Sequence, residues 1–347
     1  MKNYYSQENH GPFQLYDIGS LQLEEGGQLD KCELAVATYG TLNEAKDNAI
    51  LITTWYSGTS KIMEQVYIGE EHTLDPNKYF IIVVNQIGSG LSTSPSNYSG
   101  EKTAFPKVRI TDDVNAQYKL LTEHFGITSL ALVMGGSMGA QQTYEWIVRY
   151  PNFVKRAAAM AGTAKNSEHD FLYAETLIEA ITDDPGFQQG RYSSSAEVSK
   201  GLSQHAKLWT VMGWSTEFFR LGRHKELGFS SLDDFYQQFM VGYFADMDPN
   251  NLLCMAWKWQ RADVSRHENG DLAKALAQVK AKVFVMPISH DMFFSYTDCL
   301  AEQKLIPNSE FRPLQSIDGH LGLFGTDPQM VAQVDNILAE LLNTEMN

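Results

Sequence analysis

Cysteine is scarce in this sequence, and the few cysteines are scattered. Cys32, Cys254 and Cys299 lie far apart in the chain, and no C-x-x-C pair occurs. Zinc sites and redox motifs need cysteines at such short spacings, and small disulfide-stapled domains carry many more of them. The three residues therefore predict ordinary thiols of a reducing compartment, not a disulfide framework or a metal site.

Long hydrophobic runs and positive charge are also in short supply. No window approaches the roughly 18 consecutive apolar residues of a membrane-spanning helix, and the first ten residues hold no apolar core of signal-peptide length. Lys and Arg number 27 against 42 Asp and Glu, which gives a net charge of −15. An acidic surface repels phosphate backbones and anionic lipids. We therefore expect a soluble, cytoplasmic protein whose main partner is neither a nucleic acid nor a membrane.

The sequence does contain enough hydrophobic material for a large core. Hydrophobic residues make up 43% of the 347 positions and aromatic residues 12%, which excludes a disordered chain. Short apolar, β-branched runs alternate with helical stretches, a pattern typical of an α/β fold with a mostly parallel sheet and helices on both faces. The expected strands are 49–53, 79–84, 130–134, 157–160, 283–286 and 311–314, with an edge hairpin from 14–23 and 32–39, and the expected core helices are 111–124, 141–150 and 328–342.

Between about residues 163 and 275 the pattern changes. Met, Trp, Phe and Tyr become dense, and helical stretches at 170–182, 195–212, 232–243 and 250–263 replace strands. An insertion of this length between two strands is typical of a helical lid that encloses a substrate pocket and excludes water. We therefore expect a core domain of residues 1–163 and 276–347 and a lid insertion of residues 164–275. Exposed aromatics of the insertion would equally suit a dimer contact.

A G-x-S-x-G motif at residues 135–139 joins the apolar run 130–134 to a helical stretch. Between a strand and a helix, this motif is the nucleophile elbow of α/β-hydrolase folds. Glycine suits the sharp turn because a side chain would clash there, and the N–H groups at the helix start favour developing negative charge. The bare motif also arises by chance in glycine-rich turns, but its strand–helix setting predicts that Ser137 is a nucleophile.

A serine nucleophile needs a base and a carboxylate that orients the base. In α/β-hydrolases these partners follow in the chain order Ser, Asp or Glu, His. Asp291 lies in the loop after the expected strand 283–286, and His320 lies in the loop after 311–314. We therefore predict a triad of Ser137, Asp291 and His320.

Two neighbours in the sequence are rivals for these positions. His290 precedes the last expected strand and shares the loop of the acid, which argues against it as the base. Asp318 is only two residues from His320, too close for easy support of the imidazole ring, although it stays an alternative acid.

An oxyanion hole would complete the site with two N–H donors. The backbone of Met138, directly after the nucleophile, is the first expected donor, and the amide of Tyr56 in the loop after 49–53 is the second. Gly88-Ser89-Gly90 lacks the third glycine of a dinucleotide fingerprint, and no H-E-x-x-H motif is present. We therefore expect no bound cofactor and no metal.

Taken together, these residues resemble the homoserine O-acetyltransferase family, a branch of the α/β-hydrolase fold. The similarity runs from about residue 34 to 324, and its motifs lie at 74–85, 105–114, 135–151, 184–187 and 190–192. The resemblance implies acyl transfer from acetyl-CoA through an acyl-serine. It assigns the triad to Ser137, Asp291 and His320, in agreement with the strand order.

The sequence departs from that family at two charged anchors. Family acetyltransferases have an aspartate directly after the catalytic histidine, for the homoserine amine, where this chain has Leu321. They also have an arginine in the lid, for the carboxylate, where the alignment places Ile178. A zwitterion buried without these partners would cost several kcal/mol per charge, as an order of magnitude. Leu321 and Ile178 therefore predict a pocket for apolar esters.

We consequently expect a carboxylesterase that hydrolyses short-chain acetate esters and resembles the esterase-like members of the family. The alternative is an acetyl-CoA-dependent O-acetyltransferase that acts on homoserine or another alcohol. A non-catalytic binding protein is disfavoured because such proteins usually lack a triad residue, whereas this chain has all three. The resemblance and the aromatic lid together suggest a homodimer formed through lid helices.

Overall fold

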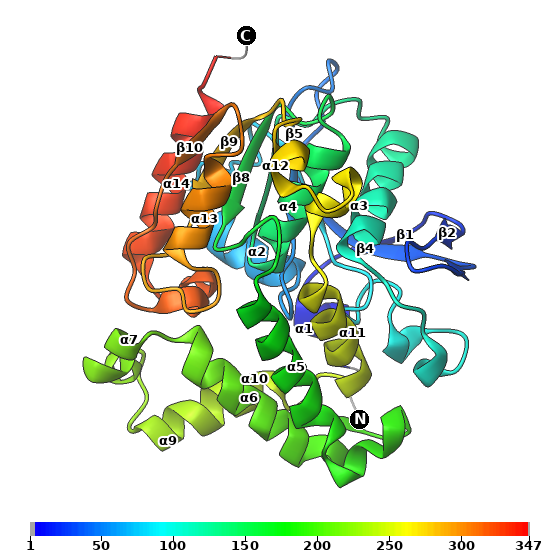
Figure 1. Ribbon diagram of the computed structural model, residues 1–347, viewed down its shortest axis with the longest axis vertical. Helices are drawn as coiled ribbons and strands as arrows, with labels where there is room; N and C mark the ends of the chain where they lie inside the picture. Colours follow the sequence, from blue (N-terminus) through cyan, green and yellow to red (C-terminus); the bar gives the residue numbers. More distant parts are fainter. Residues whose placement is uncertain (1–3, 346–347) are drawn as a thin grey trace.

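An eight-stranded sheet lies at the centre of the computed structural model, which describes residues 4–345 (Figure 1). The strand order is β1-β4-β6-β5-β7-β8-β9-β10. From β6 to β10 all neighbours are parallel, and β4 is antiparallel to β1 and β6. The bounds are β1 (Gln14–Asp17), β4 (Glu33–Tyr39), β5 (Ala49–Thr53), β6 (Phe80–Val84), β7 (Leu132–Gly136), β8 (Arg156–Met160), β9 (Lys282–Met286) and β10 (Ser309–Phe311). The predicted α/β fold with a mostly parallel sheet is confirmed.

The expected strand 130–134 lies two residues later, as β7, and two other strands also differ in extent from the prediction. β10 ends at Phe311, and Leu314 forms only an isolated bridge with Ile288. Pro313 separates them, and proline has no N–H to continue the ladder. The expected edge hairpin is present as β1 and β4, but the chain between them forms a second small sheet of β2 (Leu21–Gln22) and β3 (Gln28–Leu29).

Helices cover both faces of the sheet because its strands are apolar on both sides. In β5, Leu51 belongs to the hydrophobic cluster that includes α3 (Ile110–Lys119) and α4 (Met138–Arg149). Ile50 and Ile52 belong to the opposite cluster, with α2 (Ser60–Tyr67) and α14 (Pro328–Leu342). The alternation of side chains along a strand accounts for this division. The last helix has the predicted bounds.

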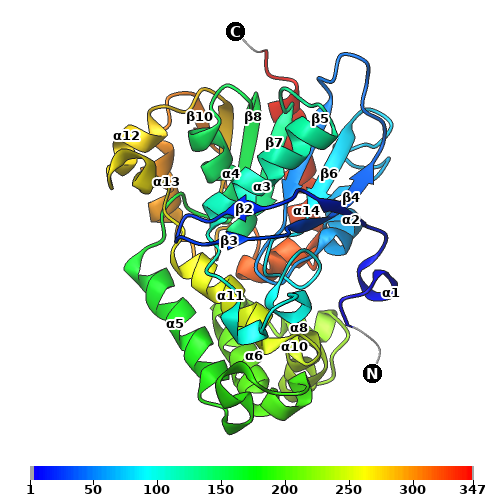
Figure 2. The ribbon, with the colours of Figure 1, turned by 90° about the vertical axis from the view of Figure 1, so that its right-hand side faces the viewer.

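Helices α5 to α11, both included, form a layer below the sheet in Figures 1 and 2, and we call this layer the lid. A fully buried ion pair between Lys258 on α11 and Asp113 on α3 fastens this layer to the core. α12 (Leu272–Leu276), whose first four residues the predicted insertion includes, lies beside the sheet in both views. The lid helices are α5 (Glu168–Thr182), α6 (Ser199–Gly213), α7 (Thr216–Arg220), α8 (Arg223–Glu226), α9 (Leu232–Phe235), α10 (Gly242–Phe244) and α11 (Pro249–Gln260).

The helix expected over residues 232–243 is present and runs to Phe244, but it is not α-helical throughout. Its middle, Tyr236–Val241, is π-helical and joins α9 to α10. Within residues 4–345, the helices are all too short or too polar to cross a membrane.

Candidate active site

Ser137 lies at the sharp turn between β7 and α4. Its backbone has φ 56° and ψ −124°, a conformation that residues with a side chain rarely adopt. Thr53, at the end of the adjacent strand β5, supports the turn from below. Its Oγ1 donates to the carbonyl oxygen of Gly139 at 2.8 Å and lies 3.1 Å from that of Met134. The strained serine is therefore fixed by its neighbours on both sides of the elbow.

The glycines of the motif are required by the close approach of β5. A Cβ atom at Gly135 would lie 2.3 Å from Thr53 Oγ1, and one at Gly139 would lie 2.4 Å from Thr53 O. Both distances are far below van der Waals contact, so a larger residue would push the elbow away from the sheet. The glycines thus let Ser137 sit directly above the carboxyl edge of the strands.

Ser137, His320 and Asp291 form one hydrogen-bonded chain. The Oγ of Ser137 lies 2.9 Å from Nε2 of His320, and Nδ1 of His320 lies 2.7 Å from Oδ2 of Asp291. The other oxygen of Asp291 accepts from the backbone N–H groups of Phe293 at 2.8 Å and Phe294 at 3.2 Å. Both carboxylate oxygens are thereby held, and the carboxylate orients the imidazole toward the serine.

The imidazole and the carboxylate of this triad are buried in apolar surroundings. The side chain of His320 is 3% exposed and that of Asp291 is 0% exposed. Aromatic rings pack around the imidazole, with centroid distances of 4.9 Å to Phe293, 5.7 Å to Phe294 and 6.4 Å to Trp209. Interactions between charges and dipoles are stronger in such an apolar enclosure than in water.

The two rivals for the triad positions point elsewhere. Nδ1 of His290 lies 2.9 Å from Ser289 Oγ and 3.1 Å from the carbonyl oxygen of Ser316. The buried carboxylate of Asp318 pairs with Arg223 of the lid. Neither His290 nor Asp318 takes part in the hydrogen bonds that link Asp291, His320 and Ser137.

The residues predicted for the oxyanion hole lie at the same edge of the sheet. Met138 is the first residue of α4, where backbone N–H groups have no intrahelical partner. Tyr56 follows β5, and β5 and β7 are paired so that Thr53 lies opposite Gly135. The side chain of Tyr56 turns away toward the lid, where its hydroxyl lies 3.0 Å from both Leu252 O and Nε2 of His205.

A pocket opens onto Ser137 and His320. Its walls combine the loop after β5, the lid and the segment that follows His320. The lining residues are Trp55, Tyr56, Ser57, Ser137, Trp209, Met240, Tyr243, Phe244, His320, Leu321, Leu323 and Phe324. None of these residues is an Asp, Glu, Lys or Arg, so the cavity suits an uncharged ligand.

Of the two predicted pocket residues, Leu321 lines this cavity and Ile178 does not. Ile178 lies on α5, whose buried residues include Tyr173, Leu177 and Ile181. One residue further along a helix is a turn of about 100°, so Ile178 sits beside these buried residues and packs against the core only in part. A role of Ile178 toward the substrate stays a prediction.

The lid supplies pocket residues that the sequence did not single out. Trp209 and Tyr243 belong to helices α6 and α10, far along the chain from the elbow. The only signal for them was the density of aromatics in the insertion. His205, also on α6, contacts the hydroxyl of Tyr56. Burial lowers the pKa of the His205 imidazole to about 3, so this ring is neutral.

A hydroxyl, an imidazole and a carboxylate in this order are the groups that acyl transfer through an acyl-serine requires. Among the described residues 4–345, no three His, Cys, Asp or Glu side chains are grouped as a metal ion would need.

Comparison with known proteins defines the family. The model of the alpha/beta hydrolase fold family matches residues 65–323. The chain belongs to this family.

Within the family, the chain is similar to esterases over its whole length. It is 69% identical over 346 residues to an ethyl acetate hydrolase of Pseudomonas veronii, covering 99% of both chains. It is 55% identical over 345 residues to a probable esterase of Corynebacterium glutamicum, again over 99% of both. The structure of the acetyl esterase MekB superimposes with a TM-score of 0.97 at 70% identity, covering 98% of this chain and 99% of that one.

The resemblance to homoserine O-acetyltransferases is real but more distant. The enzyme of Leptospira meyeri is 33% identical over 299 residues, which covers 79% of this chain and 78% of that one. The prediction of an esterase-like member of this group is therefore confirmed.

Proposed function

We propose that this protein is a carboxylesterase that hydrolyses short-chain acetate esters through an acyl-enzyme on Ser137. The observation that carries the proposal is the unbroken chain from Ser137 Oγ to His320 at 2.9 Å and from His320 to Asp291 at 2.7 Å. The printed names of the most similar relatives, an ethyl acetate hydrolase and an acetyl esterase, support the substrate class.

In the proposed reaction, Nε2 of His320 takes the proton of Ser137 as Oγ attacks the ester carbonyl. The backbone N–H groups of Met138 and Tyr56 stabilise the oxyanion of the tetrahedral intermediate, and loss of one such donor costs about 3 kcal/mol. His320 then protonates the departing alcohol. Water, deprotonated by the same imidazole, releases the carboxylic acid and restores the serine.

The apolar cavity supports an ester over an amino-acid acceptor. Leu321 is 4% exposed and lies next to His320, and the cavity walls offer no charged side chain to an ammonium or carboxylate group. An acceptor such as homoserine would leave its charges unpaired there, which is strongly unfavourable. This disfavours the alternative of acetyl-CoA-dependent transfer to homoserine.

A paired assay tests the function. One arm follows acid release from ethyl acetate and its propionate, butyrate and hexanoate analogues, and the other follows CoA release from acetyl-CoA with and without homoserine. We expect hydrolysis that is fastest with acetate, no homoserine-dependent CoA release, and unchanged rates after chelator treatment, in line with a reaction that needs no cofactor. Ser137→Ala should abolish hydrolysis while Ser230→Ala, at an exposed lid serine, should not. Strong homoserine-dependent release would overturn the assignment.

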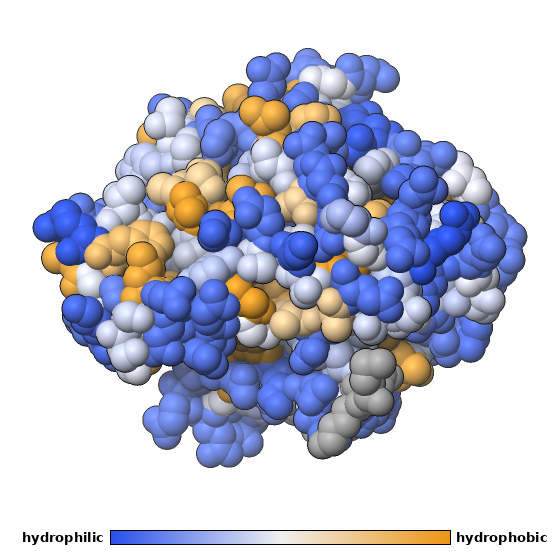
Figure 3. All heavy atoms as spheres, turned by 90° about the horizontal axis from the view of Figure 1, so that it is seen from below, coloured by the Kyte–Doolittle hydropathy of each residue, from blue (hydrophilic) through white to orange (hydrophobic). Residues whose placement is uncertain are grey.

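We further propose that residues 164–275 act as a lid and that lid helices form a homodimer. Seen from the lid side, hydrophobic residues emerge between polar ones (Figure 3). Large exposed apolar side chains of the lid are Phe171, Leu172, Val211, Leu221 and Leu232. Sedimentation of the purified protein tests the dimer. A cytoplasmic location, proposed because Cys32, Cys254 and Cys299 are free thiols, is tested by cell fractionation.

A further inference from the structure

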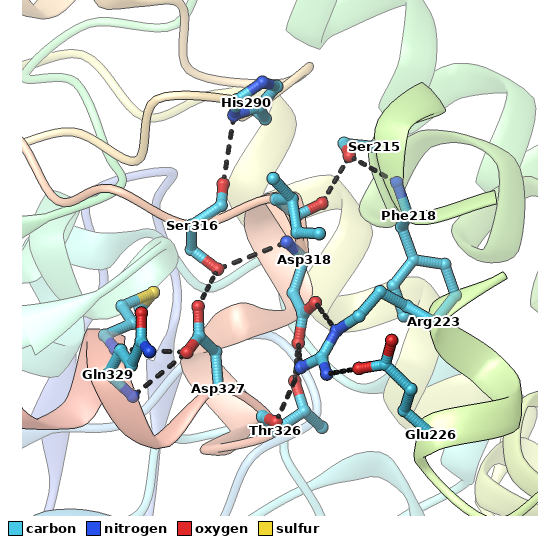
Figure 4. A network of polar contacts seen from close by, with 12 residues as sticks. Ser215, Phe218, Arg223, Glu226, His290, Ser316, Asp318, Thr326, Asp327 and Gln329 are labelled. Atoms are coloured by element: carbon cyan, nitrogen blue, oxygen red, sulfur yellow. Dashed lines mark hydrogen bonds and ion pairs between the residues drawn. The ribbon is translucent and has the colours of Figure 1, made fainter. Parts of the chain in front are cut away.

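The loop that carries the imidazole, residues 316–320, is joined to the lid by a buried ion pair. The side chain of Asp318 is 0% exposed. Its Oδ1 accepts from Nε of Arg223 on α8 at 3.1 Å, and its Oδ2 lies 3.4 Å from Nη2 of the same guanidinium. The hydroxyl of Thr326 donates to Oδ2 at 2.7 Å. Figure 4 shows Arg223 reaching from the lid to Asp318, with Glu226 on its other side.

Backbone contacts reinforce this junction. Ser215, between α6 and α7, donates its hydroxyl to the carbonyl oxygen of Ile317 (Figure 4). Gly319 has φ +68°, and a Cβ there would lie 2.9 Å from the nitrogen of Ser215 and 3.1 Å from the carbonyl oxygen of Gly213. The lid backbone therefore packs directly on the residue that precedes His320.

On its other side the loop is held by the core. The hydroxyl of Ser316 donates to Asp327 at 2.7 Å and accepts from the backbone N–H of Asp318 at 3.2 Å. Asp327 also caps α14 by accepting from the N–H of Gln329 at 3.0 Å (Figure 4). The loop is thus held by hydrogen bonds to the start of α14 on one side and to the lid on the other. Its one carboxylate, that of Asp318, forms its ion pair with the lid.

A buried carboxylate needs its cation, because an unpaired charge in the interior is strongly unfavourable. If the lid moved away from the loop, Asp318 would lose Arg223 and keep only the Thr326 hydroxyl. The ion pair therefore links the position of the lid to the position of the loop. His320 is two residues from Asp318. A shift of the ion pair would therefore also change the distance between the imidazole of His320 and the hydroxyl of Ser137.

We propose that Arg223 and Asp318 are positioning residues for catalysis: their ion pair seats the lid on the loop 316–320 and so sets His320 against Ser137. The proposal deepens and rests on the proposed function. It assigns no chemical step to either residue. It predicts that the pair affects the rate of the chemical step, since small misplacements of reacting groups cost large factors in rate.

The test compares Arg223→Gln, Arg223→Lys, Asp318→Asn and the double variant Arg223→Gln/Asp318→Asn. Titration of Ser137 with a fluorophosphonate gives the number of competent sites, so that kcat is expressed per labelled serine. Arg220→Gln is the matched control, because Arg220 forms an exposed pair with Glu217 on the neighbouring helix α7. Circular dichroism records folding of each variant independently.

We expect kcat of Arg223→Gln to fall at least about tenfold with KM changed by less than about threefold. Arg223→Lys should recover part of the loss, because it keeps the charge but not the planar fork. The double variant should lose no more than Arg223→Gln alone, since both changes break one link, and it removes the unpaired carboxylate should Arg223→Gln fold poorly.

Three results would overturn the proposal. They are a kcat per labelled serine in Arg223→Gln within about twofold of the wild type, an equal loss in Arg220→Gln, or losses in the double variant that multiply as for independent sites. A wild-type protein in which Ser137 is not labelled would instead refute the proposed function itself.

Discussion

Replacing Asp291 by asparagine probes the logic of the triad with almost no change in shape. Oδ1 of Asp291 accepts from the N–H groups of Phe293 and Phe294, and Oδ2 faces Nδ1 of His320 at 2.7 Å. The two backbone groups can only donate, so they will select the amide oxygen of the new side chain. Its NH2 group must then point at His320.

This orientation reverses the hydrogen bond to the imidazole. Nδ1 of His320 would have to accept, so the ring proton would move to Nε2, which lies 2.9 Å from Ser137 Oγ. An Nε2 that carries a proton cannot take the proton of Ser137. We expect kcat to fall about 10⁴-fold, or about 5 kcal/mol of barrier, the size of effect that a wrong tautomer causes in serine proteases.

The assay is steady-state hydrolysis of ethyl acetate, with folding checked by circular dichroism and thermal unfolding. Asp298→Asn is the control, because it makes the same change at an exposed position at the start of the next helix. A variant Asp291→Asn that folds and keeps kcat within about tenfold of the wild type would refute the reasoning and return attention to Asp318 as the acid.

Two further predictions concern the pocket and the buried carboxyl group of Glu302. Leu321→Asp places a charge on the apolar cavity and should lower kcat/KM for ethyl acetate at least about tenfold while favouring homoserine over water as acyl acceptor; Leu321→Asn is the neutral control, and equal effects of both would contradict the charge argument. Glu302 accepts from the N–H groups of Ala164 and Lys165, at 2.6 and 3.1 Å, yet burial raises its pKa to about 8 from the usual 4.5. The folded state therefore holds a proton that the unfolded state releases, so this group makes the free energy of unfolding decrease between about pH 5 and 8, by up to about 1.4 kcal/mol per pH unit. Urea unfolding across that range should show a shallower pH dependence for Glu302→Gln, and an unchanged slope would refute this account.

The catalytic triad could be predicted because each of its residues lies in a recognisable local sequence context. The glycines around Ser137 reflect contacts with Thr53 that only glycine permits. Asp291 and His320 follow successive strands, and the carboxyl ends of parallel strands meet at one edge of the sheet. Strand order along the chain was therefore enough to bring three distant residues together.

The substrate pocket could be predicted only where it adjoins that chain. Leu321 was found because it follows His320, whereas Ile178 was placed by alignment alone and is not among the residues that line the cavity. The position of a side chain on a helix depends on the helix phase relative to its neighbours, which no short motif records. Trp209 and Tyr243 enter the pocket through the packing of α6 and α10.

Asp318 shows most clearly what the tertiary structure decided. From the sequence it was a rival acid, judged only by its distance from His320 along the chain. Its partner, Arg223, lies 95 residues away on a helix of four residues whose place is set by the whole lid. The sequence by itself determined the strand order, the strained elbow and the three residues of the triad, because neighbouring residues impose those constraints. The folded lid alone decided which side chains close the cavity and which buried charge finds its counter-ion, because those contacts depend on the packing of segments that share no local pattern.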